Sequence, residues 1–310
     1  MFTLNSLGHH RSSVPPQCSA GAMPWAERPN GAAKAYTAIT MSADGQKLVL
    51  LNKNGGSPDA TGAAWYSSNM GSSWTVSTGS PGVNWVTAAS GDTGQFVVAG
   101  ITGIGVFTST NAGAYFAQKA SAAAVVSVDC DATGQTLAYA VDNGLLYVST
   151  DSGSNWAAQS GTPGAAYWRG LALSANGSRL VAVEGNNSVS PGGYIWQRAG
   201  GIWTRASDAG PGFWRAVASS ADGLGLVVVA TDGVIKTSSD GGSTWQGRAL
   251  GAPQTLQAVT SSADGQHLSV AAKGGYIWTS ADAGEHARPI CKAPTRLACE
   301  GGTVVNGAAR

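Results

Sequence analysis

Charged residues are scarce in this chain of 310 residues. Asp, Glu, Lys and Arg together make up 11% of the sequence, less than half of the roughly 25% found in an average soluble domain. The 18 Lys and Arg residues stand against 17 Asp and Glu residues and leave a formal net charge of +1. A nucleic-acid-binding domain usually carries a basic excess, so we expect no nucleic-acid partner.

Long apolar runs and clustered metal ligands are also missing. No stretch approaches the roughly 18 consecutive apolar residues of a membrane span, so we expect no membrane insertion. Residues 1–24 hold no continuous apolar segment of the kind that a secretory signal requires. The four cysteines form no C-x-x-C pair, and no His, Asp or Glu cluster has ligand spacing. The sequence therefore predicts no metal site and no cofactor.

The cysteines have different expected environments. Cys130 has the surroundings of a buried small apolar residue. Cys18, Cys291 and Cys299 lie near the chain ends, where a disulfide from Cys18 to either of the others stays open because sequence does not fix the pairing.

Glycine, by contrast, is abundant. It accounts for 44 residues, about twice the usual share, but no strict Gly-X-Y spacing occurs, which excludes collagen. Many tight turns explain the excess better. A hydrophobic content of 43% over this length is enough for one large domain or two small ones.

An alternating pattern that ends in a turn glycine recurs six times along the chain. Residues 216–223 (AVASSADG) and 258–265 (AVTSSADG) are nearly the same. The turn glycines are Gly45, Gly94, Gly134, Gly177, Gly223 and Gly265, spaced 40 to 49 residues apart. This spacing is typical of a propeller or a solenoid. Each turn leads into a second β-rich run, as in a hairpin, and nothing in the interior has a helical period, so we expect an all-β fold.

A second turn recurs in the same units. Residues 238–245 read SSDGGSTW, and residues 67–74, 109–116 and 149–156 read SSNMGSSW, STNAGAYF and STDSGSNW. The fourth copy keeps Gly200 and Trp203, with Trp196 in the Ser position and Arg198 in the Asp position. The sixth copy keeps Ser280 and Asp282 but has no aromatic residue at its end.

This second turn resembles the Asp-box, or bacterial neuraminidase repeat, S-x-D-x-G-x-T-W. The resemblance implies a structural role: the Asp or Asn oxygen accepts hydrogen bonds from turn amides, the glycine adopts a conformation closed to other residues, and the aromatic ring fills the space between sheets. It implies a β-propeller and no particular substrate.

The repeats predict a six-bladed β-propeller over residues 23–290. Residues 1–22 are expected to be a disordered or extended segment, and residues 291–310 a tail or the start of a further module. Residues 285–290 make a poor strand, whereas the segment around Trp25 looks like the outer strands of other units. We therefore expect this N-terminal segment to supply the last outer strand and close the ring, which removes an exposed sheet edge. A seven-bladed ring is the alternative if upstream sequence is missing.

Function is expected at the channel mouth, where loops vary without disturbing the sheets. The candidate ligand-binding residues on this rim are Tyr36, Trp85, Trp168, Arg169, Glu184, Trp214, Arg215 and Gln257. The aromatic rings would stack on a sugar or a protein side chain, and Arg169 with Arg215 would grip a carboxylate. Alternatively, the Trp side chains wedge between blades and the arginines pair with Asp142, Glu184 or Asp232.

Two families share these repeats. Similarity to sialidases implies removal of terminal sialic acid through three Arg, an Asp acid and a Tyr/Glu pair. The chain lacks the early Arg-Ile-Pro element, since Arg28 is followed by Pro29, and shows no third rim arginine. Similarity to photosystem II assembly factors implies protein binding through a basic patch, of which Arg169 and Arg215 would be a thin version.

We therefore expect a noncatalytic interaction or scaffold propeller that binds a protein or a glycan at the channel mouth. No catalytic residue is assigned, and a sialidase-like glycosidase remains the enzymatic alternative. Two N-x-S sequons, at Asn176 and Asn186, fit an extracellular or cell-surface location. The sequence does not set the oligomeric state.

Overall fold

The computed structural model describes residues 36–53, 63–79, 81–82, 84–185, 192–250, 254–275 and 277–289, with the backbone of 299–300 and 303–304. Regular structure in these ranges consists of strands, and none of them holds a helix long and apolar enough to cross a membrane. The predictions for residues 1–22, for Trp25 and for most of residues 291–310 lie outside the described part. Cys18 and Cys291 lie outside it as well, so the prediction of a disulfide from Cys18 to Cys291 or Cys299 is untested.

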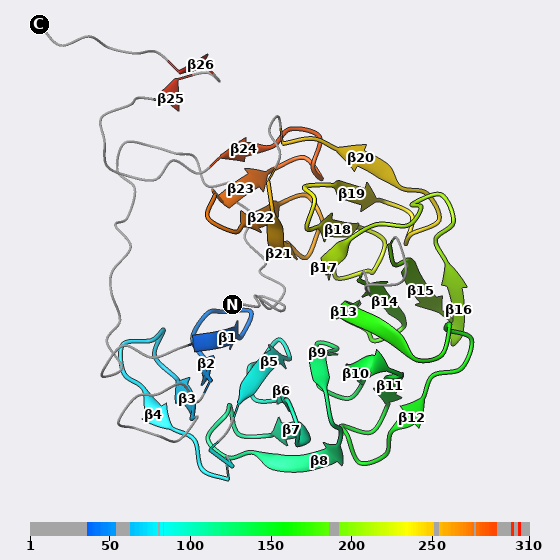
Figure 1. Cartoon of the computed structure of the whole chain (residues 1–310). Helices are drawn as coiled ribbons and strands as arrows, with labels where there is room; N and C mark the ends of the chain where they lie inside the picture. Colours follow the sequence, from blue (N-terminus) through cyan, green and yellow to red (C-terminus); the bar gives the residue numbers. More distant parts are fainter. Residues whose placement is uncertain are drawn as a thin grey trace, which may run out of the picture.

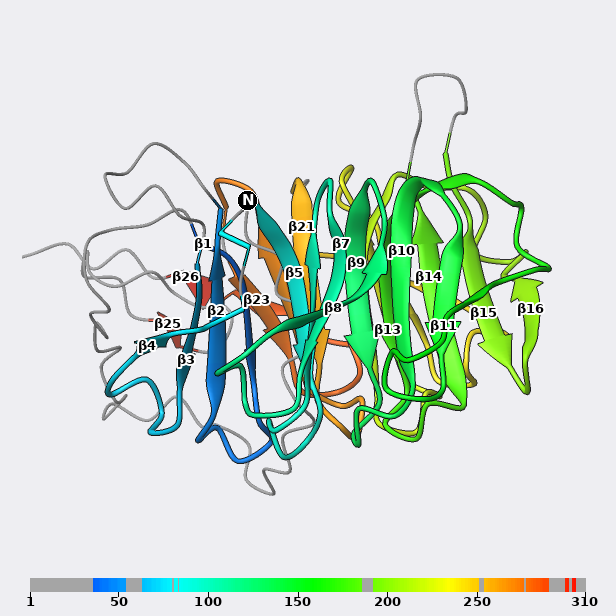
Figure 2. The same cartoon turned by 90° about the horizontal axis from the view of Figure 1, so that it is seen from below.

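The strands follow one another in groups of four, here called units, and each unit runs from the centre of the molecule outward (Figure 1). In Figure 2 the strands run between the two faces of the resulting disc. The units are β1 (Tyr36–Met41), β2 (Leu48–Asn52), β3 (Ala64–Ser67) and β4 (Thr75–Val76); β5 (Trp85–Ser90), β6 (Val97–Ile101), β7 (Gly105–Ser109) and β8 (Ala117–Ser121); β9 (Val125–Cys130), β10 (Leu137–Gly144), β11 (Leu146–Ser149) and β12 (Ala157–Ala158); β13 (Ala166–Leu173), β14 (Arg179–Glu184), β15 (Ile195–Ala199) and β16 (Ile202–Arg205); β17 (Trp214–Ser219), β18 (Leu226–Ala230), β19 (Ile235–Ser238) and β20 (Gln246–Arg248); and β21 (Leu256–Ser261), β22 (Leu268–Ala272), β23 (Ile277–Ser280) and β24 (Arg288–Pro289). Two short strands, β25 (Cys299–Glu300) and β26 (Thr303–Val304), pair only with each other.

Hydrogen bonding divides these units differently from the prediction. It gives four separate four-stranded blades and one eight-stranded sheet in which β10 pairs with both β9 and β13. Asp142 pairs with Tyr167, and Gly144 with Ala166. Only Leu145 separates β10 from β11, so β10 runs on past its own hairpin and reaches the next unit. The prediction of six separate blades is therefore wrong, and so is its seven-bladed alternative.

The prediction that an N-terminal strand closes the last sheet is also wrong. The outer strand of that sheet is β24, which pairs with β23 through Thr279 opposite Arg288 and Trp278 opposite Pro289. A proline is tolerated at a sheet edge because no ladder hydrogen bond is required of its nitrogen there. The segment judged too poor to form a strand therefore forms a short one.

A chain of backbone hydrogen bonds links neighbouring units near one face of the disc. The amide of each residue in the series donates to the carbonyl oxygen of the next one, at 2.8 Å, in the order Ala43, Asp92, Ala132, Ala175, Ala221, Ala263. Among the described residues no bond returns from Ala263 to Ala43, and β21 does not lie against β1 as the other consecutive inner strands do. The described ring is therefore open at one junction.

The apolar core is also arranged unit by unit along the chain. Five apolar clusters each fill the space between two consecutive units. In the β21–β24 unit, Val259, Leu268 and Val270 pack against the preceding unit. Their equivalents in the first unit, Ile39, Leu48 and Leu50, are half-buried, and no described sheet covers that face.

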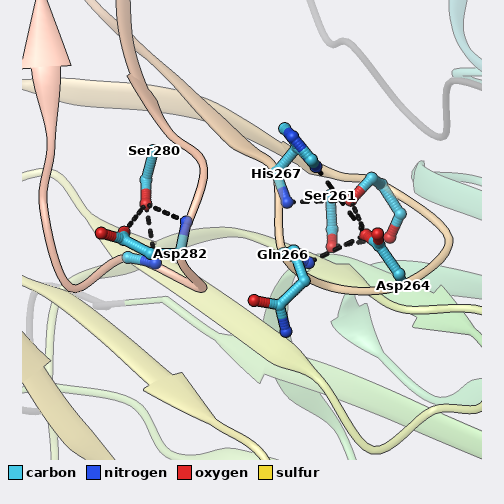
Figure 3. Close-up of polar contacts among 8 residues, drawn as sticks. Ser261, Asp264, Gln266, His267, Ser280 and Asp282 are labelled. Atoms are coloured by element: carbon cyan, nitrogen blue, oxygen red, sulfur yellow. Dashed lines mark hydrogen bonds and ion pairs between the residues drawn. The ribbon is translucent and has the colours of Figure 1, made fainter. Parts of the chain in front are cut away.

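The recurring second turns are held by their own side chains. In the fifth unit the Ser238 hydroxyl donates to Asp240 at 2.7 Å and accepts the amide of Gly242 at 2.9 Å. Gly242 has a φ of 91°, a backbone region that favours glycine. Figure 3 shows the same arrangement around Ser280 and Asp282, beside the first turn of that unit, where Asp264 accepts the amide of Gln266. These turns fix the strand ends, which places the opposite ends of the inner strands around the channel.

Candidate functional site at the channel mouth

The site begins with a repeated irregularity in the inner strands. Each of the six inner strands contains a residue that its pairing register skips: Tyr36 pairs with Asn52 and Ala38 with Leu51, for example, so the register passes over Thr37 between them. The skipped residues are Thr37, Val86, Val126, Arg169, Arg215 and Gln257. A β-bulge of this kind re-aims a side chain and ends regular pairing. The bulges therefore occupy equivalent positions at the same end of the six inner strands, and we call these positions the mouth ring.

Three consecutive members of the mouth ring are polar. The Arg215 Nε donates to the Gln257 Oε1 at 3.4 Å. Burial, and after it the positive charge of Arg169, lower the pKa of Arg215. Arginine still stays protonated in proteins, so two positive charges lie close together in a partly desolvated place. Such a pair of charges favours a nearby anion, and Asp142 supplies one from within the protein.

Arg169 has a protein partner within the described part. Its Nη1 donates to the Asp142 Oδ1 at 2.8 Å, and its guanidinium lies 5.9 Å from the centre of the Tyr167 ring. The side chains of Arg169 and Asp142 are 24% and 36% exposed. Pairing of Arg169 with Asp142 was one of the predicted alternatives, and it is confirmed.

The predicted aromatic residues directly precede members of the mouth ring in the sequence, but most of their side chains are buried between the units. Trp85 and Trp168 are fully buried and Trp214 is 2% exposed. The Trp168 Nε1 donates to the carbonyl oxygen of Gly144 at 2.9 Å, and Tyr36 is half-buried. The three indoles thus pack between units, as the second of the predicted alternatives has it.

Glu184 forms its hydrogen bonds with Tyr194 and Trp196 rather than with the arginines of the mouth ring. Its Oε1 accepts from the Trp196 Nε1 at 2.8 Å and its Oε2 from the amide of Tyr194 at 3.1 Å. Burial raises the pKa of Glu184, while these two hydrogen bonds and the charge of Arg205 act in the opposite direction. Both oxygens of this carboxylate are therefore engaged in holding β14 against β15.

The structure thus brings Arg169, Arg215 and Gln257 together, while Glu184 is engaged with Tyr194 and Trp196. Thr37, Val86 and Val126 complete the mouth ring but were not among the predicted site residues. Their signal in the sequence is their place in the repeat, directly before the first residue of the alternating segment. In the described part, no group of three or more His, Cys, Asp or Glu side chains is placed to hold a metal ion.

Comparison with known proteins identifies the fold alone. No protein-family model and no curated protein matches the sequence. Among solved structures, a GH74 enzyme from Niastella koreensis superposes with a TM-score of 0.66 at 17% identity, over 80% of this chain and 45% of the enzyme. YCF48 bound to D1 peptide gives 0.59 at 15% identity, over 83% and 82%, and YCF48 from Cyanidioschyzon merolae gives 0.61 at 14%, over 87% and 90%. The chain therefore spans under half of the GH74 enzyme and most of YCF48, and it shares with both a β-propeller fold.

Proposed function

We propose that this protein is a noncatalytic interaction propeller that binds an extended protein segment at the channel mouth through a carboxylate of that segment. The observation that carries the proposal is the placement of Arg169, Arg215 and Gln257 on neighbouring inner strands. Guanidinium groups bind carboxylates through paired, charge-assisted hydrogen bonds. The resemblance of the second turns to the Asp-box supports a scaffold role for the sheets behind this site.

The remainder of the mouth ring suits a peptide. Val86 and Val126 lie on the two units that precede the arginines around the ring and are half-buried. A ligand with one charged group and one apolar side chain would therefore meet matching chemistry on two sides of the mouth. The likeness to YCF48 bound to D1 peptide supports a peptide over other ligands.

The carboxylates near the mouth argue against hydrolysis. A glycosidase needs two carboxyl groups that face the scissile bond from opposite sides. Asp142 is paired with Arg169, and both oxygens of Glu184 accept hydrogen bonds from the protein. A glycan is the second candidate ligand because GH74 enzymes share the fold.

We also propose that the protein acts outside the cell or at its surface.

A binding screen tests the proposal. Fluorescence anisotropy would compare a peptide library with free C-terminal carboxylates against the same library with amidated ends, using wild-type protein, R215Q and R169Q. We expect hits that lose about tenfold or more in affinity on amidation and in either variant, about the worth of one charge-assisted hydrogen bond. Arg288→Gln removes an exposed charge from the outer strand β24 and serves as the matched control.

Three outcomes would overturn the proposal. Equal binding of free and amidated peptides would show that the ligand's carboxylate is not recognised. Unchanged affinity in R215Q would show that the peptide binds elsewhere. Turnover of a fluorogenic sialoside by the wild-type protein would show an enzyme instead.

A further inference from the structure

The hairpin between β15 and β16 differs from its counterparts. Opposite the second-strand residue that lies three positions after the first-turn glycine, the other units place a serine, namely Ser67, Ser109, Ser149, Ser238 and Ser280. In the β13–β16 unit the residue opposite Leu180 is Arg198. The sequence alignment had put Trp196 in the Ser position and Arg198 in the Asp position, and the strand register shows that this is wrong by two residues.

The cause is a shorter turn. Residues 199–202 connect Arg198 to its partner Trp203, whereas residues 239–244 lie between Ser238 and Trp245. The turn is therefore two residues shorter and holds neither the serine hydroxyl nor the Asp or Asn side-chain oxygen that brace the other turns. A guanidinium group takes the place of those two groups.

A cavity of about 230 Å³ lies beside this short turn, between the β13–β16 unit and the next blade. One wall carries Arg179, Gln197 and Arg198, and the opposite wall carries Ser219, Gly241 and Ser243. We call it the arginine cavity. Its lining contains no Asp and no Glu.

Arg179 reaches across the junction to form part of the cavity. A Cβ placed on Gly241 would lie 2.5 Å from the Arg179 Nη1, and one placed on Gly223 would lie 2.8 Å from its Cδ. The two glycines thus leave room for the arginine side chain against the next blade. Larger residues at either position would displace the guanidinium.

The cavity carries uncompensated positive charge. No described carboxylate forms an ion pair with Arg179 or Arg198. The Arg198 Nε and the Gln197 Oε1 are buried and have no hydrogen-bond partner. A partly desolvated cation without a counterion destabilises the folded state, and a bound anion would offset that cost.

We propose that the arginine cavity binds a tetrahedral oxyanion, phosphate or sulfate, free or as part of a larger molecule. Two guanidinium groups on separate strands offer several N–H donors. On the facing wall the hydroxyls of Ser219 and Ser243 donate to the carbonyl oxygens of Ser220 and Asp240, and rotation about the Cβ–Oγ bond would turn either one to an anion. A planar carboxylate is satisfied by one guanidinium, whereas a tetrahedral group uses donors on all sides. Since a water molecule takes about 30 Å³ of liquid volume, the cavity also has room for atoms attached to the oxyanion.

This site is distinct from the mouth ring. Arg215 lies at the start of β17 and Ser219 at its end, and the strand rises about 3.3 Å per residue. The arginine cavity therefore opens near the face of the disc that carries the turns, while the mouth ring lies at the other end of the same strand. A ligand at one site leaves the other uncovered.

Isothermal titration calorimetry of the full chain with inorganic phosphate, sulfate and acetate at constant ionic strength tests the proposal. We expect saturable binding of phosphate or sulfate with a stoichiometry of one, and binding of acetate at least tenfold weaker. Arg198→Gln and Arg179→Gln should each weaken the oxyanion by tenfold or more, and Arg288→Gln should leave it unchanged. Absence of saturable binding, or wild-type affinity in R198Q, would overturn the proposal.

Two further measurements distinguish a loss of binding from a folding defect. Arg198→Lys keeps the charge, and we expect it to lose less affinity than R198Q. In buffer without phosphate or sulfate, R198Q should melt at or above the wild-type temperature because an uncompensated charge is gone. A melting temperature of R198Q well below that of the wild type would instead show that Arg198 has a structural role. Peptide binding at the mouth ring should be unchanged in R198Q, which would show that the arginine cavity and the proposed function are independent.

Discussion

The guanidinium of Arg169 meets the carboxylate of Asp142 at 2.8 Å across the joint where β10 pairs with β13. This ion pair lies where two four-strand units merge into one sheet. It therefore fastens the joint and, at the same time, holds one of the two arginines at the channel mouth. A ligand carboxylate that binds Arg169 has to compete with Asp142.

Replacing Asp142 with Asn separates these two roles. Both side chains are partly exposed, and ion pairs of this kind contribute about 1 kcal/mol or less, so we expect a loss of that size in the free energy of unfolding. Binding of a carboxylate-bearing peptide should become several-fold tighter, because the competing charge is removed. Urea unfolding and fluorescence anisotropy measure the two effects.

A weaker peptide complex in D142N would contradict this prediction. It would mean that Asp142 orients Arg169 for the ligand. Asp232→Asn, in the turn before β19, removes the same charge from a residue that forms no described ion pair and serves as the control.

The sequence predicted the parts of this fold that depend on local chemistry. Turn glycines such as Gly223 and Gly242, with the Ser and Asp residues around them, mark hairpins because few other residues tolerate those backbone angles. It did not predict how strands join across units. Asp142 and Tyr167 pair because β10 runs past a one-residue connection, and this depends on the distance between sheets, which no repeat pattern records.

The candidate site divides in the same way. The repeat predicted that Arg169, Arg215 and Gln257 lie at one mouth, since equivalent positions in a propeller share a face. It left open whether Trp168 faces a ligand or the core, because either placement satisfies an indole at the end of a strand. The arginine cavity was missed because Arg198 was aligned by sequence, without the strand register.

Trp85 should be one of the most sensitive positions for stability. It is fully buried, and its ring centre lies 5.5 Å from that of Phe107 and 5.2 Å from that of Phe116. Truncation to Ala leaves a cavity between the first two units, and we expect it to lower the free energy of unfolding by about 3–5 kcal/mol. Val76→Ala, at a side chain that is 47% exposed, should change it by less than about 0.5 kcal/mol. Equal unfolding midpoints in denaturant for the two variants would contradict the packing described here.

Cys130 should resist thiol reagents in the folded protein. It is a buried, free cysteine, as the sequence predicted, and burial followed by the charges of Asp129, Asp131 and Asp92 raises its pKa. The thiolate is the reactive form, so alkylation by iodoacetamide at pH 8 should be at least about tenfold slower in buffer than in urea. Mass spectrometry of the peptide that contains Cys130 distinguishes it from the other cysteines, and equal rates in the two conditions would show an open site.

Acid should destabilise the second turns that contain Asp and leave those that contain Asn unaffected. Asp151 has its pKa lowered to about 2, first by the amide of Asn155 and then by the Asn155 side chain and Ser149. Asp240 has its pKa lowered to about 2, first by the hydroxyl of Thr244 and then by its amide. A carboxyl whose pKa is lower in the folded state stabilises that state above its ordinary pKa, near 3.9 for Asp, and this contribution is lost as the pH falls through the lowered value. We therefore expect stability to fall between about pH 4 and pH 2.

The first two units supply internal controls, because Asn69 and Asn111 replace the Asp and carry no charge. Their Oδ1 atoms accept hydrogen bonds from the amides of Ser73 and Tyr115 at 2.9 Å. The equivalent bonds in the two acidic turns run from the Asn155 amide to Asp151 at 2.8 Å and from the Thr244 amide to Asp240 at 2.9 Å. In an NMR titration, the amide protons of Asn155 and Thr244 should shift with a midpoint near pH 2, while those of Ser73 and Tyr115 stay in place. The double variant D151N/D240N should lose part of the acid sensitivity of unfolding. Identical titration of all four amides would mean that global acid unfolding, rather than protonation of these two carboxylates, sets the pH dependence.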